Sequence, residues 1–316
     1  MPGRISWLGH AVGVYALGAA VVCAGLASTA SADSFGSGAN QFDIDFVTID
    51  GSTNPTGGYD IVNNDYRIGV YEITNGQWNK FKAELGVPVT GDPSNAYYED
   101  PYWTGTNVPT NEVSWYEAAQ FVNWLNTSEG HQAAYKFTGT QGQSDYALAT
   151  WSAGDADGTN LYRHKDAFYY LPTEDEWVKA GYWNGTGFQT WATPDDTQPV
   201  EDVEANYGWE SGAQPWDVGS GSEELNGTFD IMGNVYEWME SPYASGDYGV
   251  GSFRGLRGGD YSFSDYYLAS SSGGHYFRPY TGDCNIGFRV ASEVPEPFTF
   301  GLLSLGGLAL LARRRR

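Results

Sequence analysis

Alternating apolar and acidic side chains open the folded part of the chain. Residues 42–49 read Phe-Asp-Ile-Asp-Phe-Val-Thr-Ile, so apolar and acidic positions take turns over the first half of the run. Because successive side chains of a strand point to opposite faces, this pattern predicts a strand with one buried face. Residues 66–73 are rich in aromatic and β-branched side chains and predict a second strand.

Three later stretches carry apolar residues at helical spacing behind a capping residue. Thr74 precedes a helix that we expect to reach about residue 85. Ser114 with Glu117, and Thr173 with Glu176, have the spacing of a capping box, which satisfies free backbone N–H groups at a helix start. After residue 181 the pattern predicts only loops and short strands. Early helices followed by irregular β structure indicate an α+β fold.

Composition adds to this picture. Aromatic residues make up 16% of the chain and glycines number 42, which favours a loop-rich fold whose core is filled by large rings.

The first 32 residues have the pattern of a secretory signal peptide. Arg4 precedes an apolar run over residues 11–26, and Ala30-Ser31-Ala32 forms an A-x-A cleavage site before Asp33. The run is short for a membrane helix and ends in small residues. We therefore predict export, with the mature chain beginning at Asp33.

The last 22 residues form a second targeting segment. Pro295-Glu296-Pro297 is followed by an apolar run over residues 298–312 and by four terminal arginines. This order resembles the PEP-CTERM sorting signal of exported bacterial proteins. The resemblance implies transient membrane association, processing by an exosortase, and delivery to the cell surface or extracellular matrix through a Gram-negative-type envelope.

Between these ends, residues 33–294 amount to one domain with a strong negative charge. The ends hold five of the 16 basic and one of the 39 acidic residues, so 11 basic residues face 38 acidic ones and the mature charge is near −27. Such a surface repels nucleic acid and anionic lipid. Cys284 is the single cysteine left after processing, so an internal disulfide is excluded.

A short segment, Asp-Ile-Met-Gly-Asn-Val-Tyr-Glu-Trp at residues 230–238, concentrates polar groups between apolar ones. Asp230 and Glu237 offer carboxylates, while Gly233 and Val235 could offer carbonyl oxygens. Oxygen ligands of this kind suit a hard cation such as calcium.

Six motifs together carry a family resemblance. They are YRIGVYEITNGQWNKF at residues 66–81, VSWYEAAQFVNWL at 113–125, YLPTEDEWVKAGY at 170–182, DIMGNVYEW at 230–238, LRGGDY at 256–261 and NIGFRVA at 285–291. In this order they resemble the formylglycine-generating enzyme, or sulfatase-modifying factor, family over about residues 42–292. The resemblance implies a C-type-lectin-like α+β fold with few short helices, short strands and long loops.

The resemblance also implies which catalytic groups are missing. Enzymes of this family bind copper through two cysteines shortly after the motif that here reads Gly-Gly-Asp, and soft thiolates suit Cu(I). Phe263 and Leu268 stand roughly where that pair falls, Asp260 replaces a serine, and Cys284 lies elsewhere without a partner. We therefore expect no copper and assign no catalytic residue.

The same resemblance implies structural calcium. Carried over to this sequence, the ligands of one site are Asp230, Gly233, Val235 and Glu237. A second, less complete site uses Asn206 and the Tyr207 carbonyl. A plain hydrogen-bonded loop is the alternative for both.

Aromatic and hydroxyl side chains surround the former catalytic position, and such groups suit sugars or peptides. In an aromatic-rich chain the same residues could instead belong to the core. The candidate ligand pocket consists of Asp260, Tyr261, Phe263, Tyr266, Tyr267, Ser270 and Tyr276.

Two classes of function follow. The first is a non-catalytic surface module that binds an exopolysaccharide or surface protein, or serves as a matrix component. The second is a divergent metal-dependent oxidoreductase acting on protein or small-molecule thiols.

Overall fold

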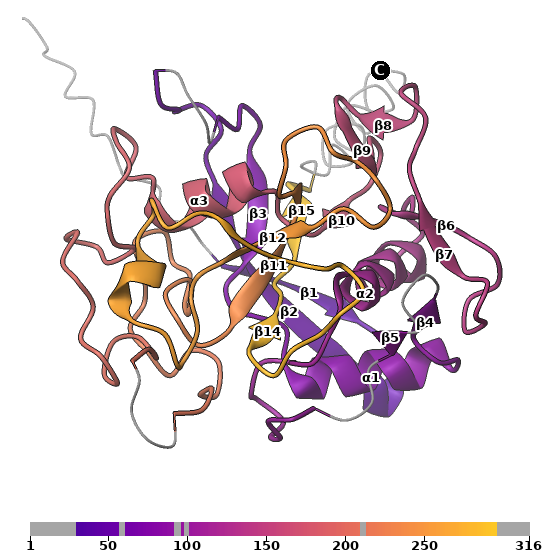
Figure 1. Ribbon diagram of the computed structural model, residues 1–316, viewed down its shortest axis with the longest axis horizontal. Coiled ribbons are helices and arrows are strands. Elements are labelled where there is room, and N and C mark those ends of the chain that lie inside the picture. The colour runs from indigo at the N-terminus through magenta and orange to yellow at the C-terminus, as the bar shows by residue number, and fades with distance from the viewer. Residues whose placement is uncertain (1–29, 57–60, 92–95, 98–100, 209–212, 296–316) are drawn as a thin grey trace, which may run out of the picture.

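The computed structural model describes residues 30–56, 61–91, 96–97, 101–208 and 213–295 (Figure 1). Nearly all of the predicted signal peptide and sorting segment therefore lies outside the described residues. Within them, no helix has the length and apolar character needed to cross a membrane.

An antiparallel five-stranded sheet joins the two ends of the domain. Its strand order is β1-β2-β3-β15-β10, so the last strand of the domain lies between an early and a middle one. The predicted strand at residues 42–49 is confirmed, with alternating burial over its first half. The strands are β1 (Ser31–Phe35), β2 (Phe42–Ile49), β3 (Tyr66–Gly69), β10 (Tyr169–Tyr170) and β15 (Ala291–Glu293).

The second predicted strand is shorter than the sequence indicates. It ends at Gly69, because beyond that residue the backbone turns toward the first helix. Two backbone hydrogen bonds hold this turn. Val70 N–H donates to the Asp45 carbonyl at 2.8 Å, and Ile73 N–H donates to the Phe288 carbonyl at 2.9 Å.

A four-stranded sheet carries the later motifs, in the order β13-β12-β11-β14. Strand β14 runs parallel to β11, whereas the other pairs are antiparallel. In Figure 1 this sheet crosses the middle of the molecule in orange and yellow. The strands are β11 (Tyr236–Pro242), β12 (Arg254–Arg257), β13 (His275–Phe277) and β14 (Ile286–Gly287).

The three predicted helices are confirmed in the described part of the chain. They are α1 (Asn75–Leu85), α2 (Trp115–Ser128) and α3 (Glu174–Tyr182), and each begins with a capping box at Thr74, Ser114 or Thr173. The Thr74 box uses Gln77 as its third residue.

Short elements complete the described chain. Three two-stranded ladders lie in the connections: β4 (Thr90–Gly91) with β5 (Ala96–Tyr97), β6 (Lys136–Thr138) with β7 (Ala147–Ala149), and β8 (Ala156–Asp157) with β9 (Asn160–His164). Two 3₁₀ turns, η1 (Gly38–Asn40) and η2 (Asp265–Leu268), are added to these.

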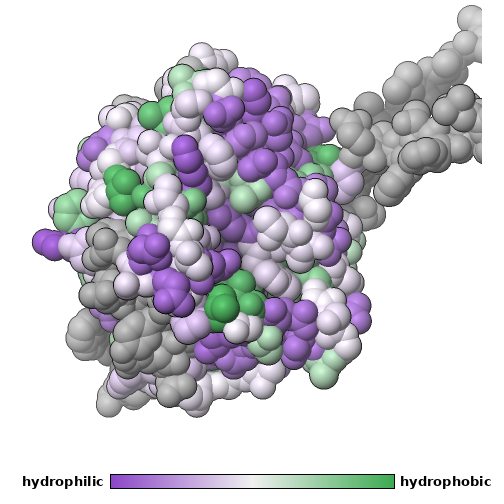
Figure 2. Space-filling model, turned by 90° about the vertical axis from the view of Figure 1, so that its right-hand side faces the viewer, coloured by the Kyte–Doolittle hydropathy of each residue, from purple (hydrophilic) through white to green (hydrophobic). Residues whose placement is uncertain are grey.

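Large rings fill the core, as the composition predicts. Trp78, Phe81 and Phe121 join α1 to α2, with Phe81 and Phe121 ring centroids 5.0 Å apart. A second buried cluster gathers around Trp177 of α3. On the face drawn in Figure 2, polar residues dominate and hydrophobic ones form small separate groups. The three helices and two larger sheets of the described chain confirm the predicted α+β fold.

Candidate functional site

The 230–238 motif is anchored by a fully buried ion pair. The Arg289 guanidinium, which follows β14, contacts both Glu237 carboxylate oxygens at 2.6–2.9 Å. The Trp177 indole N–H donates to Glu237 Oε2 at 2.8 Å, which ties α3 to the same carboxylate. Glu237 thus fastens together three motifs that lie far apart in sequence.

Two further carboxyls meet beside this ion pair. Asp230, in the left-handed region at φ 60°, accepts a bond from Gly219 N–H at 2.7 Å. Glu72 Oε1 accepts from the Asn234 amide at 3.0 Å, whereas its buried Oε2 has no donor. Burial first, and the Asp230 charge next, raises the pKa of Glu72 well above its ordinary value. Burial likewise raises the pKa of Asp230.

These contacts bear on the calcium prediction. A calcium ion at Glu237 would share oxygens that already accept from Arg289 and Trp177. The Glu72–Asp230 pair, by contrast, includes a carboxylate oxygen, Glu72 Oε2, that receives no hydrogen bond. This pair therefore suits a cation better than Glu237 does. Within the described ranges, no group of three or more His, Cys, Asp or Glu side chains is arranged to hold a metal ion.

The second predicted calcium segment lies against the first. Asn206 pairs with Gly233 in a parallel bridge, and its side chain donates to the Asn234 side-chain oxygen at 3.1 Å. The Tyr207 hydroxyl, which is not the predicted ligand atom, donates to the Pro199 carbonyl at 2.7 Å. The structure therefore brings the two predicted calcium segments together as one region.

The predicted ligand pocket, in contrast, is divided. Its first group surrounds the Tyr261 hydroxyl, which accepts from the Trp103 indole at 3.0 Å and lies 3.6 Å from the Cys284 sulfur. Burial, followed by the nearby Cys284 thiol, raises the pKa of Tyr261. Asp260 is buried beside them and accepts from the Ser262 N–H and hydroxyl, both at 2.7 Å.

The second group is a set of rings around His275. Phe263 and Tyr267 have centroids 4.8 Å apart, Tyr267 and His275 are 4.7 Å apart, and Tyr236 stacks on His275 at 5.2 Å. Burial lowers the pKa of His275, and the Arg257 charge adds to the effect. Tyr266 contacts Tyr267 from outside and is 70% exposed.

Tyr276 belongs to a third group, because it follows His275 in β13 and points to the other face. It contacts Tyr243 and Phe253. Ser270 belongs to none of these ring groups: its N–H donates to the Thr190 carbonyl, and its carbonyl accepts from the Arg257 guanidinium at 3.1 Å.

A cavity of about 360 Å³ adjoins the Tyr261 group through Trp103. Two indole rings and several hydrogen-bonding side chains face it, a combination that suits a small polar ligand. The lining residues are Trp103, Thr104, Val108, Gln214, Pro215, Trp216, Asp217 and Ser220.

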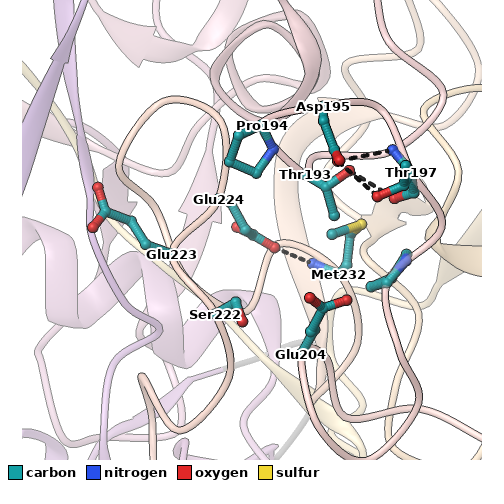
Figure 3. A pocket seen from close by; sticks show the side chains of 10 residues that line it. Thr193, Pro194, Asp195, Thr197, Glu204, Ser222, Glu223, Glu224 and Met232 are labelled. Atoms are coloured by element: carbon teal, nitrogen blue, oxygen red, sulfur yellow. Dashed lines mark hydrogen bonds between the residues drawn. The ribbon is translucent and has the colours of Figure 1, made fainter.

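A second cavity, of about 400 Å³, is acidic (Figure 3). Glu204 and Glu224 point toward the space beside the Met232 side chain, whereas Glu223 points away. Glu224 accepts from Ile231 N–H, Met232 N–H and the Thr228 hydroxyl, yet burial raises its pKa to about 8. None of the described residues that line the cavity is basic, so it attracts cations and repels anions.

The former catalytic position does not fit copper. Leu268 is fully buried in an apolar cluster, and Phe263 belongs to the His275 ring group. Cys284 is the single thiol in the part of the chain that the structure describes, whereas a thiolate copper site needs two.

Comparison with known proteins agrees with the motifs and the fold. The model of the sulfatase-modifying factor enzyme 1-like domain matches residues 28–294. The chain belongs to this family. It is also similar to the solved structure of Treponema denticola variable protein 1, with 23% identity, a TM-score of 0.60, and coverage of 84% of this chain and 100% of that one. This likeness supports the C-type-lectin-like α+β fold.

The two curated relatives of this chain carry names that point to different activities. The chain is 26% identical over 195 residues to chaperone protein LppX of Paenibacillus barcinonensis, covering 55% of this chain and 61% of LppX. It is 25% identical over 246 residues to hercynine oxygenase of Mycobacterium tuberculosis (strain ATCC 25618 / H37Rv), covering 72% and 53%. The chain thus spans about three fifths and about half of these two relatives.

Several residues of these sites were not predicted from the sequence. Trp103 and Trp216 come from separate loops, and nothing in their local pattern distinguishes them from core rings. Glu72 shows one available signal, since it lies between Tyr71 and Ile73 in a predicted strand, whereas Glu224 follows another glutamate and shows none.

Proposed function

We propose that this protein is an exported, non-catalytic member of the sulfatase-modifying-factor family that binds a ligand at the cell surface or in the extracellular matrix. Signal-like and PEP-CTERM-like ends support export, exosortase processing and transient membrane association. The proposed ligand is an exopolysaccharide or a surface protein.

One observation carries the binding function: where the copper-binding thiols of the enzymes would lie, the chain has Phe263 and Leu268, while a cavity lined by two indole rings lies beside Tyr261. A buried leucine supplies no electron pair for a metal, whereas Trp103 and Trp216 supply stacking surface. The site thus has the parts for binding and lacks those for thiol oxidation.

Structural calcium is part of this proposal. Asp230 lies beside the buried Glu72, and the same motif offers the carbonyls of Gly233 and Val235; oxygen atoms of these kinds suit calcium. Calcium would stabilise the region where the 230–238 motif meets Asn206.

A divergent thiol oxidoreductase is the second candidate, and the match to hercynine oxygenase over 72% of the chain favours it. Its metal would need ligands other than a cysteine pair. Activity on protein or small-molecule thiols would then depend on oxygen.

Elemental analysis of the purified protein separates the two candidates. We expect calcium but no stoichiometric copper or iron after dialysis, and no oxidation of a cysteine-containing peptide. A ligand screen should then give a binder whose affinity falls about tenfold in Trp216→Ala, as expected for the loss of one stacking face. The half-buried Trp151 serves as the control, since Trp151→Ala leaves the cavity lining intact. Retained copper or iron with oxygen-dependent thiol loss would overturn the proposal.

A further inference from the structure

Three exposed aromatic rings form one surface on the four-stranded sheet. Tyr243, Phe253 and Tyr276 are 48%, 40% and 43% exposed, although few aromatic rings in the described part of the chain are exposed. Tyr243 and Tyr276 centroids are 3.9 Å apart, and Phe253 lies edge-on to Tyr276 at 5.0 Å. We call these three residues the aromatic platform. Single exposed rings are common, but adjoining ones mark interaction surfaces.

The backbone holds the aromatic platform in place. Tyr243 follows β11, Phe253 precedes β12, and Tyr276 is the middle residue of β13, so adjacent strands supply the three rings. Tyr243 N–H donates to the Phe253 carbonyl at 2.8 Å, which fixes two of the rings relative to each other. Rings on a paired sheet lose little conformational freedom when a ligand binds.

Charge limits what the aromatic platform can bind. The mature chain, near −27 by sequence, repels polyanions. A cationic ligand would be repelled by the exposed Arg278. Its guanidinium lies 5.9 Å from the Phe253 centroid and donates to the Tyr280 hydroxyl at 2.6 Å. A neutral ligand avoids both repulsions and can use the ring faces together with the tyrosine hydroxyls.

Size separates a sugar from a protein partner. A buried aromatic side chain covers about 150–250 Å², so three rings that are nearly half exposed offer roughly 200–350 Å². A stable protein interface needs about 800 Å² on each partner. The aromatic platform is therefore too small to hold a protein, but it fits one or two sugar rings.

We propose that the aromatic platform binds a neutral polysaccharide, with pyranose rings stacked on Tyr276 and Tyr243. This surface is separate from the cavity beside Tyr261, and the inference rests on the proposed function only in requiring an extracellular ligand. Binding by a single platform is weak, and many copies of the protein along one polymer would strengthen it.

Affinity gel electrophoresis of the full chain tests the proposal. The gels contain soluble β-glucan, xylan or galactomannan, with anionic alginate in a parallel gel. We expect at least one neutral polymer to retard the protein, and Tyr276→Ala and Tyr243→Ala each to raise the apparent Kd about tenfold. Tyr146→Ala is the matched control, because Tyr146 stacks on Phe137 of β6 at 4.6 Å and lies outside the aromatic platform and both cavities. Thermal melts of all variants verify folding.

Four results would overturn the inference. They are no retardation by any neutral polymer, retardation by alginate only, equal retardation of the wild type and Tyr276→Ala, and loss of retardation in Tyr146→Ala instead. If Trp216→Ala abolishes retardation while Tyr276→Ala does not, the cavity beside Tyr261 is the sugar site. The proposed function then stands, while the aromatic platform assignment fails.

Discussion

At the residue scale, buried arginines connect sequence motifs that lie far apart along this chain. Arg289 bonds Glu237, and Arg163 bonds Glu176 at 2.9 Å and Glu240 at 2.8 Å. The free energy needed to remove such charges from water is about as large as the Coulombic attraction between them. An intact buried ion pair therefore adds little net stability. Removing one partner, however, leaves an uncompensated charge inside the core.

We expect Glu237→Gln to lower the free energy of unfolding by about 3 kcal/mol, the low end for a broken buried pair. The expected cost is at this low end because Glu72 and Glu224 also face Arg289 and can release a proton to offset its charge once Glu237 is neutral. Urea denaturation measures it. The control is Glu174→Gln, because Glu174 is 40% exposed where it bonds Arg257 and its loss costs less than about 1 kcal/mol. Equal costs for the two variants would contradict the argument.

A second residue-scale prediction concerns the proton between Glu72 and Asp230. The pKa of Glu72 is raised in the folded state above its ordinary 4.5, so the folded chain keeps a proton that the unfolded chain releases. The stabilisation of the fold by this bound proton is complete below pH 4.5. It is lost as the pH rises through the raised folded-state pKa of Glu72. In Glu72→Gln, the amide can donate to Asp230 at every pH.

Melting temperatures between pH 5 and 9, in the presence of chelator, check this expectation. Glu72→Gln should melt close to the wild type at pH 5 and above it at pH 8, with a gap that widens as pH rises. A variant that is less stable than the wild type at pH 8 would show that Glu72 is needed in its ionised form.

At the scale of elements, short sequence patterns predict the helices, whereas the ends of strands depend on contacts between residues far apart in sequence. Thr74, Ser114 and Thr173 were identified as helix starts because a capping box depends on residues three positions apart. The end of β3 at Gly69 depends instead on Asp45 and Phe288, which no local pattern contains.

The candidate pocket shows the same limit. Its residues surround the former catalytic position along the sequence, but β13 directs Tyr276 to the face opposite His275, so Tyr276 contacts Phe253 while Tyr267 contacts His275. Trp103 reaches Tyr261 from 158 positions away. Aromatic composition therefore predicted that ring clusters exist, while the register of β13 determined how they are divided.

The α3 cap gives an element-scale prediction. Thr173→Ala removes the hydroxyl that accepts from Glu176 N–H at 3.2 Å, so unfolding should become easier by about 1 kcal/mol. Thr159→Ala, at an exposed threonine outside any helix, should change stability by less than about 0.5 kcal/mol. Chemical denaturation compares the two, and equal effects would show that the cap contributes nothing specific.

At the scale of the whole molecule, the calcium proposal predicts a metal-dependent melting temperature. Saturating calcium at 100 times its Kd stabilises by about 2.7 kcal/mol, which is a shift of roughly 5–10 °C for a domain of this size. Chelator should lower the melting temperature by that amount, and calcium but not magnesium should restore it. Asp230→Asn should reduce the shift, and identical melts with chelator and calcium would favour the hydrogen-bonded loop.

Processing of the N-terminus is the last whole-molecule prediction, and the structure sharpens it. Strand β1 begins at Ser31, so cleavage after Ala32 removes two of its five pairs with β2. Asp33 remains, and it bonds the buried Arg67 at 2.6 Å and the Tyr169 hydroxyl at 2.8 Å. Because β1 is an edge strand, losing its first two residues should cost little, whereas losing Asp33 would leave Arg67 without its carboxylate.

The intact mass of the exported protein should therefore correspond to a chain that begins at Asp33. Within that mature chain, Asp33→Asn should lower the free energy of unfolding by about 3 kcal/mol, and Asp43→Asn, at an exposed position of β2, by less than about 1 kcal/mol. A mature chain that begins before Ser31 would place the cleavage site upstream and keep β1 whole. Equal stability of the two variants would mean that Arg67 does not depend on the new N-terminal residue.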